Sequence, residues 1–96
     1  MQRFEEVKRI INQHRETLEQ QYKVANIAIF GSYARGEQTD ESDVDILVEF
    51  KEPVGFTFIH LADFLEGLLK TKVDLITPDA MKPNRRKYIM EDLTYV

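Results

Sequence analysis

Two aspartates separated by one residue, Asp43 and Asp45, lie where a predicted strand begins. Side chains two positions apart on a strand leave the same face, here with Cα atoms ~7 Å apart. Both carboxylates could therefore converge on one divalent cation, because hard cations prefer oxygen ligands. The same spacing also occurs where a polar strand edge exposes two solvated carboxylates, so the pair alone leaves both interpretations open.

A third carboxylate, Asp74, lies between Val73 and Leu75 in a short apolar segment. Burying a carboxylate is costly unless the group is paired or binds a metal, and exposure at a sheet edge avoids that cost. Asp74 is therefore either exposed at an edge or a companion of the first two aspartates.

A possible phosphate-binding turn is formed by Gly31 and Ser32, which stand where an apolar segment ends and are separated from Asp43 by ten residues. Glycine lets backbone N–H groups approach a phosphate, and a following helical turn would direct its N-terminal dipole at the anion. Gly-Ser is also a common turn, so the pair gains meaning only from its combination with the carboxylates. Arg35, one helical turn beyond Ser32, could reach a phosphate or lie in solvent.

The elements that would position these residues follow from the spacing of apolar residues. Helical spacing predicts helices over residues 2–21, 56–70 and 84–93, and short β-branched or alternating runs predict strands over residues 24–30, 44–50 and 72–77. With no internal repeat or linker, the order helix, strand, strand, helix, strand, helix indicates a single α+β domain over residues 1–96.

The composition excludes several function classes. The chain has 96 residues, of which 43% are hydrophobic and 31% charged, so it is typical of a globular protein. A net charge of -4 and a pI near 5.1 disfavour direct nucleic-acid binding, which depends on excess Lys and Arg. The lack of Cys excludes thiolate metal sites. The sequence has no run of ~18 apolar residues, which is the length that a membrane-spanning helix needs. We expect a cytoplasmic protein.

The remaining polar candidates have weaker support. His14 and His60 lie in the first two predicted helices with no second His or Cys nearby, so both are interpreted as packing residues rather than metal ligands. Tyr33, beside the Gly-Ser turn, could stack on a base or pack in the core. The basic run 85–87 could meet a nucleotide or an acidic partner, or be the solvated start of a helix.

The run GSYARGEQTDESDVDILVEF, residues 31–50, closely resembles the nucleotidyltransferase superfamily of the DNA polymerase beta type. The similarity is closest to its minimal nucleotidyltransferase branch, which includes antitoxins paired with HEPN-domain toxins. The run KTKVDLIT is similar to that family's third-carboxylate strand, and the resemblance extends from about Val7 to Tyr95. It implies a small mixed sheet of about three to four strands backed by helices, as in the palm of polymerase beta.

The resemblance also implies the roles of the site residues. Asp43, Asp45 and Asp74 would hold two Mg²⁺ ions together with the triphosphate of ATP, and Asp74 would also help deprotonate the acceptor hydroxyl. Paired cations of this kind stabilise both the attacking and the leaving oxygens of phosphoryl transfer. The residues implied for nucleotide binding are Gly31 and Ser32, with Arg35 as a further candidate.

The leading functional hypothesis is transfer of AMP from ATP to a tyrosine hydroxyl of a HEPN ribonuclease toxin encoded by a neighbouring gene. This chain would be the antitoxin, which forms a hetero-oligomer with the toxin and neutralises it. Larger members of the superfamily carry acceptor-binding domains, whereas these 96 residues form little beyond the catalytic sheet. Two alternatives stay open. One is a non-catalytic antitoxin that acts by occlusion, and the other is a stand-alone transferase acting on a small hydroxylated molecule.

Overall fold

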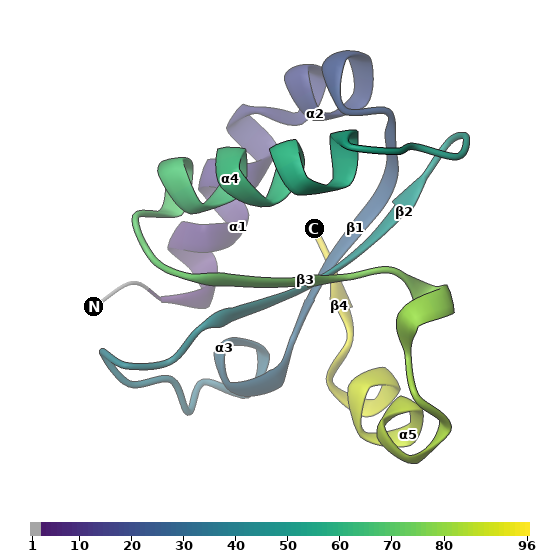
Figure 1. Ribbon diagram of the computed structural model, residues 1–96. Coiled ribbons are helices and arrows are strands. Elements are labelled where there is room, and N and C mark those ends of the chain that lie inside the picture. Colours follow the sequence, from purple (N-terminus) through teal and green to yellow (C-terminus); the bar gives the residue numbers. More distant parts are fainter. Residues whose placement is uncertain (1–2) are drawn as a thin grey trace.

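A four-stranded sheet with helices on both faces forms the framework of the protein, as the computed structural model of residues 3–96 shows (Figure 1). The helices are α1 (Phe4–Gln13), α2 (Arg15–Gln21), α3 (Gly31–Arg35), α4 (Thr57–Leu69) and α5 (Pro83–Asp92), with a 3₁₀ turn at Pro78–Ala80. The strands are β1 (Val24–Phe30), β2 (Val44–Phe50), β3 (Val73–Ile76) and β4 (Thr94–Tyr95). The α+β prediction is confirmed.

The sheet is mixed and has the strand order β3-β2-β1-β4. Strand β1 pairs antiparallel with both β2 and β4, whereas β2 and β3 run parallel and are joined by the crossover helix α4. Because β2 lies between β1 and β3, residues at its start have neighbours on both sides. Strand β3 is at the edge.

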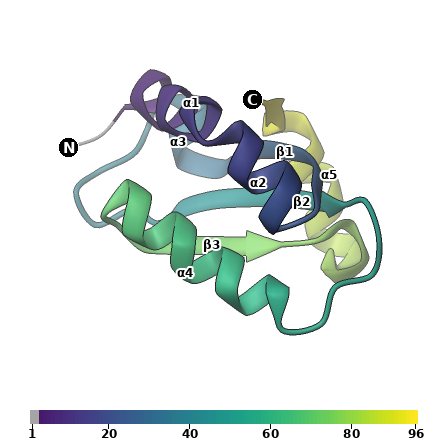
Figure 2. The same ribbon diagram turned by 90° about the horizontal axis from the view of Figure 1, so that it is seen from above.

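The main core lies between one face of the sheet and helices α1, α2 and α4, which Figure 2 shows together over that face. Alternate residues of β2 point into this core, because successive side chains of a strand face opposite sides. Each buried Leu, Ile or Val contributes roughly 1.5–3 kcal/mol relative to exposure. Strand β2 and helix α4 contribute to this main core the buried residues Val44, Ile46, Val48, Leu61, Leu65 and Leu69.

A second, smaller cluster packs helix α5 on the opposite face of the sheet, around Phe30, Leu47 and Ile89. Asp45 alternates with Ile46 along β2 and therefore faces the same side as Leu47. Asp45 thus lies on the side of the sheet that helix α5 covers, away from the main core.

The sequence-based prediction of one helix over residues 2–21 is wrong in its continuity; residue 2 itself lies outside the described residues. The chain breaks at His14, whose N–H bonds the carbonyl of Ile11 rather than that of Ile10. The carbonyl of Ile10 instead accepts a hydrogen bond from His14 Nδ1 at 2.9 Å. The imidazole ring meets Phe64 edge-on, so the packing prediction is confirmed for His14, but it is wrong for the exposed His60.

Two elements were not predicted. Strand β4 is two residues long and pairs with Ala28 and Ile29, and the 3₁₀ turn at Pro78–Ala80 follows β3 directly. Both are too short to leave a periodic pattern. Within residues 3–96, every helix falls short of the length and apolar character that a membrane crossing requires.

Candidate active site

Asp45 lies at the centre of the site because of its place in the sheet. It pairs in register with Phe30 on β1 and with Asp74 on β3. Gly31 follows Phe30 immediately, so the start of helix α3 is brought to the same point. The sheet therefore brings together Gly31, Asp45 and Asp74, three residues that are far apart in sequence.

Gly31 and the carboxylate of Asp45 approach each other closely. A Cβ atom placed on Gly31 would lie 2.1 Å from Asp45 Oδ2 and 3.0 Å from Asp45 Cγ. Gly31 also has φ +73°, a backbone conformation that side chains disfavour. Both the conformation and the missing side chain are thus required for this approach.

Helix α3 is a single short turn that begins at Gly31, as the sequence analysis expected of the Gly-Ser turn. It ends at Gly36, which has φ +72°, and Glu37 N–H bonds the carbonyl of Ser32 at 2.9 Å. Tyr33 is buried in the main core, so the packing interpretation is confirmed for it. Its burial and, to a smaller extent, the negative charge of Asp40 raise the pKa of its phenol.

The three aspartates differ in exposure. Asp43 precedes the first residue of β2 and is exposed, while Asp45 is half-buried. Asp74 is exposed on the edge strand β3, which is one of the two positions expected from the sequence. Asp74 is also the register partner of Asp45 in the pairing of β2 with β3, so both positions expected from the sequence apply to it: it is exposed at the sheet edge and it lies beside another aspartate of the site.

The surroundings of Asp45 disfavour its negative charge. The pKa of Asp45 is raised to about 6, first by burial, then by the charges of Asp74 and Asp43 and by a hydrogen bond with Asp74. The positive charge of Arg85 opposes the shift. A carboxylate in this position would be stabilised by any cation placed beside it.

The three aspartates supply the oxygen ligands that a hard metal ion needs. Within residues 3–96, no group of three or more His, Cys, Asp or Glu side chains is gathered closely enough to hold one. Asp43, Asp45 and Asp74 nevertheless offer only carboxylate oxygens, which suit a hard cation, and a cation would offset both the burial and the neighbouring negative charges that raise the pKa of Asp45. The residues fit Mg²⁺ in chemistry without forming a closed cage.

A pH dependence of stability follows from Asp45. Its pKa is higher in the folded chain than the ordinary value of 3.8, so the folded state binds the proton more tightly. Its contribution to the free energy of unfolding should fall as pH rises from about 4 to about 6 and stay low above that range. Asp45→Asn should therefore be more stable than the wild type at pH 7 without metal, by on the order of 1 kcal/mol once solvent screening is allowed for.

Urea unfolding of both proteins at several pH values between 4 and 7 measures this difference. Asp63→Asn, on the exposed side of helix α4, makes the same chemical change away from the site and is the control. A constant difference between wild type and Asp45→Asn across this pH range would contradict the assigned surroundings of Asp45.

A small cavity of about 190 Å³ opens beside Asp45, between the end of β1 and helix α5. Gly31, Asp45 and the predicted Arg35 share it with residues of α5. The α5 residues that line it are Arg85, Tyr88, Ile89 and Asp92. Tyr88 was not predicted from the sequence to be a site residue. The four α5 residues lie at helical spacing on one face, and this periodicity could have indicated a shared surface.

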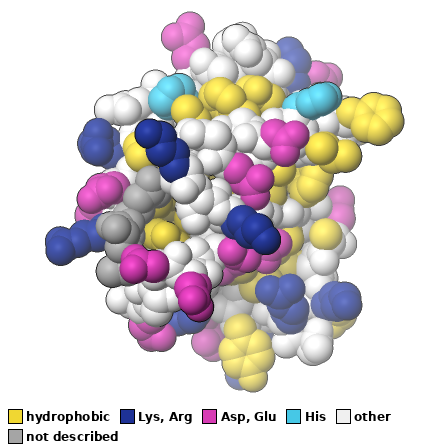
Figure 3. All heavy atoms as spheres, turned by 60° about the vertical axis from the view of Figure 1, so that its left-hand side comes forward, with side chains coloured by type: hydrophobic (Ala, Val, Ile, Leu, Met, Phe, Trp, Pro, Cys, Tyr) yellow, Lys and Arg dark blue, Asp and Glu magenta, His cyan; other side chains and the backbone are white. Residues whose placement is uncertain are grey.

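The two arginines at the cavity differ in their partners. Arg35 Nη1 lies 2.5 Å from Asp92 Oδ2, and Arg35 Nε lies 3.5 Å from a carboxylate oxygen of Glu37. Within residues 3–96, no such ion pair holds Arg85. On the face that Figure 3 presents, acidic and basic side chains are interspersed rather than gathered into a basic area.

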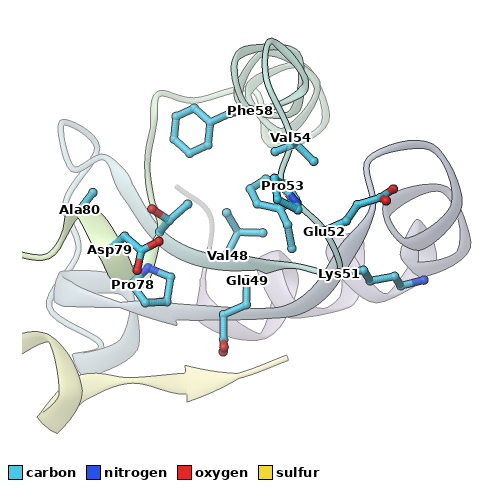
Figure 4. A pocket seen from close by; sticks show the side chains of 12 residues that line it. Val48, Glu49, Lys51, Glu52, Pro53, Val54, Phe58, Pro78, Asp79 and Ala80 are labelled. Carbon is cyan, nitrogen blue, oxygen red and sulfur yellow. The ribbon is translucent and has the colours of Figure 1, made fainter.

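A larger hollow of about 860 Å³ lies at the other end of strand β2, where Pro53 and Val54 lead into helix α4. Figure 4 shows Val48 pointing toward Phe58 across this hollow, while Glu49 points to the opposite side of the sheet. None of the predicted site residues lines the larger hollow. The carboxylates and the Gly-Ser turn meet the smaller cavity instead.

Comparison with known proteins shows which family this chain is similar to. A family model described as a nucleotidyltransferase domain matches residues 11–96. A Methanocaldococcus jannaschii relative, named as a putative protein adenylyltransferase, is 52% identical over 100% of both chains. The protein adenylyltransferase MntA of Thermococcus cleftensis is 40% identical, over 97% of this chain and 95% of its own length. A solved toxin-antitoxin structure with AMP-PNP has a TM-score of 0.71 at 26% identity, over 93% of this chain and 70% of that chain.

Proposed function

Because this chain belongs to the nucleotidyltransferase domain family, we propose that it transfers AMP from ATP to a tyrosine hydroxyl of a HEPN toxin and thereby silences that toxin. Its relatives are named protein adenylyltransferases, so the chain is a nucleotidyltransferase by family. The proposal adds the donor nucleotide, the acceptor and the partner.

The observation that carries the proposal is the approach of Gly31 to Asp45, with Asp74 in register beside them. The missing side chain lets the Asp45 carboxylate lie against the backbone of Gly31, so a cation held by the carboxylates would lie beside the turn that is proposed to bind phosphate. This explains why two features that are each common, a Gly-Ser turn and a pair of aspartates, are joined here at one point.

The residues of the site would divide the work. Asp43, Asp45 and Asp74 would hold Mg²⁺, and Gly31 and Ser32 would hold the outer phosphates. When bound, Mg²⁺ supplies charge neutralisation for the triphosphate and for the departing pyrophosphate. This chain's own residues orient the triphosphate and receive the proton of the acceptor.

The reaction is a substitution at the α-phosphorus of ATP. The acceptor oxygen forms a bond to that phosphorus, the bond to the β-phosphate breaks, and pyrophosphate leaves with its electron pair. The proton of the acceptor hydroxyl goes to the carboxylate of Asp74, which is exposed at the sheet edge and thus accessible from outside. A phenol suits this step because its pKa of ~10 is far below that of an aliphatic hydroxyl.

In this proposal the acceptor belongs to a separate protein chain. The solved toxin-antitoxin complex with AMP-PNP, similar over 93% of this chain, is consistent with an acceptor on a partner. The resemblance noted from the sequence identifies that partner as a HEPN toxin.

Mass spectrometry of the partner tests the proposal. This chain is co-expressed with the protein of the neighbouring gene, and the intact mass of that protein is measured with ATP, GTP, CTP or UTP and Mg²⁺. We expect adducts of whole AMP units on a tyrosine with wild-type protein and none with Asp43→Asn. An unmodified partner that both proteins inhibit equally would establish the occlusion alternative instead.

A further inference from the structure

Helix α5 directs one face toward the site. Arg85, Tyr88, Ile89 and Asp92 follow one another at helical spacing and all line the cavity that contains Gly31. Ile89 is buried in the second cluster and Asp92 holds Arg35, so these two serve the fold. Arg85 and Tyr88 are exposed, and neither has a structural task of this kind.

Arg85 is the cation of this cavity that is available to a ligand. Its charge acts on the half-buried Asp45, so the two groups are near each other. Arg35, in contrast, is engaged by Asp92 at 2.5 Å and by Glu37 at 3.5 Å. A guanidinium without such a partner matches the geometry of phosphate oxygens, to which it donates two parallel hydrogen bonds.

Tyr88 offers an aromatic surface one helical turn further along. Its side chain is 68% exposed although it lines the same cavity as Gly31 and Asp45. An exposed aromatic ring beside a phosphate-binding site provides a face on which a base can stack, whatever the identity of that base. The distance of one turn separates the two functions along the helix axis by ~5 Å.

We propose that helix α5 is the nucleotide-binding helix of this protein, in which Arg85 contacts the triphosphate and Tyr88 supports the base. This inference rests on the proposed function, because it assigns residues for the donor nucleotide of that reaction. It assigns the arginine contact with the phosphates to Arg85, a residue of the basic run 85–87, in place of Arg35, the further candidate named from the sequence.

Two probes separate the two roles. The affinity of the isolated chain is measured by calorimetry for ATP and for inorganic tripolyphosphate, which lacks base and ribose, each with Mg²⁺. Arg85→Ala should weaken the binding of both probes about tenfold or more, as expected for a lost charge-assisted hydrogen bond. Tyr88→Ala should weaken the binding of ATP about tenfold and leave the binding of tripolyphosphate unchanged. Tyr88→Phe should bind ATP as the wild type does, because the ring is retained.

Arg86→Ala and Lys87→Ala are matched controls. Arg86 and Lys87 are exposed on helix α5, and neither lines the cavity. Their substitution by Ala removes the same positive charge as Arg85→Ala does. If either control variant weakens the binding of ATP as much as Arg85→Ala does, the effect is one of net charge and the inference is overturned. Unchanged affinity of Arg85→Ala for both probes would also overturn it.

The binding measurement needs no partner, so the two proposals can fail separately. A wild-type chain that binds both probes as expected but leaves its partner unmodified would refute the proposed function and keep the role of helix α5. A chain that modifies its partner equally well with Arg85→Ala and Tyr88→Ala, with unchanged KM for ATP, would refute the role of α5 alone.

Discussion

With Asp45 replaced by Asn, nucleotide transfer is expected to fall on the order of 1,000-fold, because the loss of a few kcal/mol of charge stabilisation in the transition state costs about tenfold per 1.4 kcal/mol. Asp45 lies between Gly31 and Asp74 and is the carboxylate that a cation would stabilise most. The side chain keeps its size in Asn, so the fold should be retained. The initial rate of AMP incorporation into the partner measures the effect.

Glu49→Gln is the matched control for this experiment. Glu49 lies on the same strand and faces the same side of the sheet as Asp45, four residues further along, so the substitution makes the same change of charge outside the site. It should transfer at nearly the wild-type rate. Equal losses in Asp45→Asn and Glu49→Gln, or no loss in Asp45→Asn, would remove Asp45 from the metal platform.

Gly31→Ala is expected to abolish most of the activity by a steric route, with a loss on the order of 100-fold or more for a reacting group moved by about 1 Å. The added Cβ would lie 2.1 Å from Asp45 Oδ2, so the carboxylate must leave its position. A left-handed backbone at an alanine also costs roughly 1–2 kcal/mol of stability. Transfer rate and urea unfolding are both measured.

Gly36→Ala separates the two consequences. Gly36 ends the same short helix at φ +72°, nearly identical to the +73° of Gly31, but a Cβ there would meet nothing within 4 Å. Both variants should lose similar stability, and only Gly31→Ala should lose transfer. If Gly36→Ala is as inactive as Gly31→Ala, the strain in helix α3 rather than the displaced carboxylate explains the loss.

Much of the framework could be predicted from local patterns. The alternation in residues 44–50 identified strand β2 and placed Asp45 opposite Val44 and Ile46, and the apolar run ending at Phe30 placed Gly31 at a strand end. These patterns work because burial of one strand face dominates the local energetics. The family resemblance then supplied what no local pattern contains, namely that the two segments meet.

The features that could not be predicted depend on distant contacts. The pairing of β4 with Ala28 and Ile29 joins segments more than sixty residues apart and involves two residues, too few for a pattern. The break at His14 depends on a competing side-chain bond to Ile10. For the basic run 85–87 the sequence left contact with a nucleotide, contact with an acidic partner and a solvated helix start all open, because nothing in the sequence shows that Arg85 and Tyr88 border the carboxylates across the fold.

The parallel pairing of β2 with the edge strand β3 protects the site against changes in loop length. A slip of β3 by one residue would turn Asp74 into the core and carry the buried Leu75 to the surface, so the energy that packs the core also holds Asp74 beside Asp45. Insertions in the connections at residues 37–42 or 51–56, which lie outside both strands, would leave that alignment unchanged. The length of these connections can therefore change while Asp45 and Asp74 stay side by side.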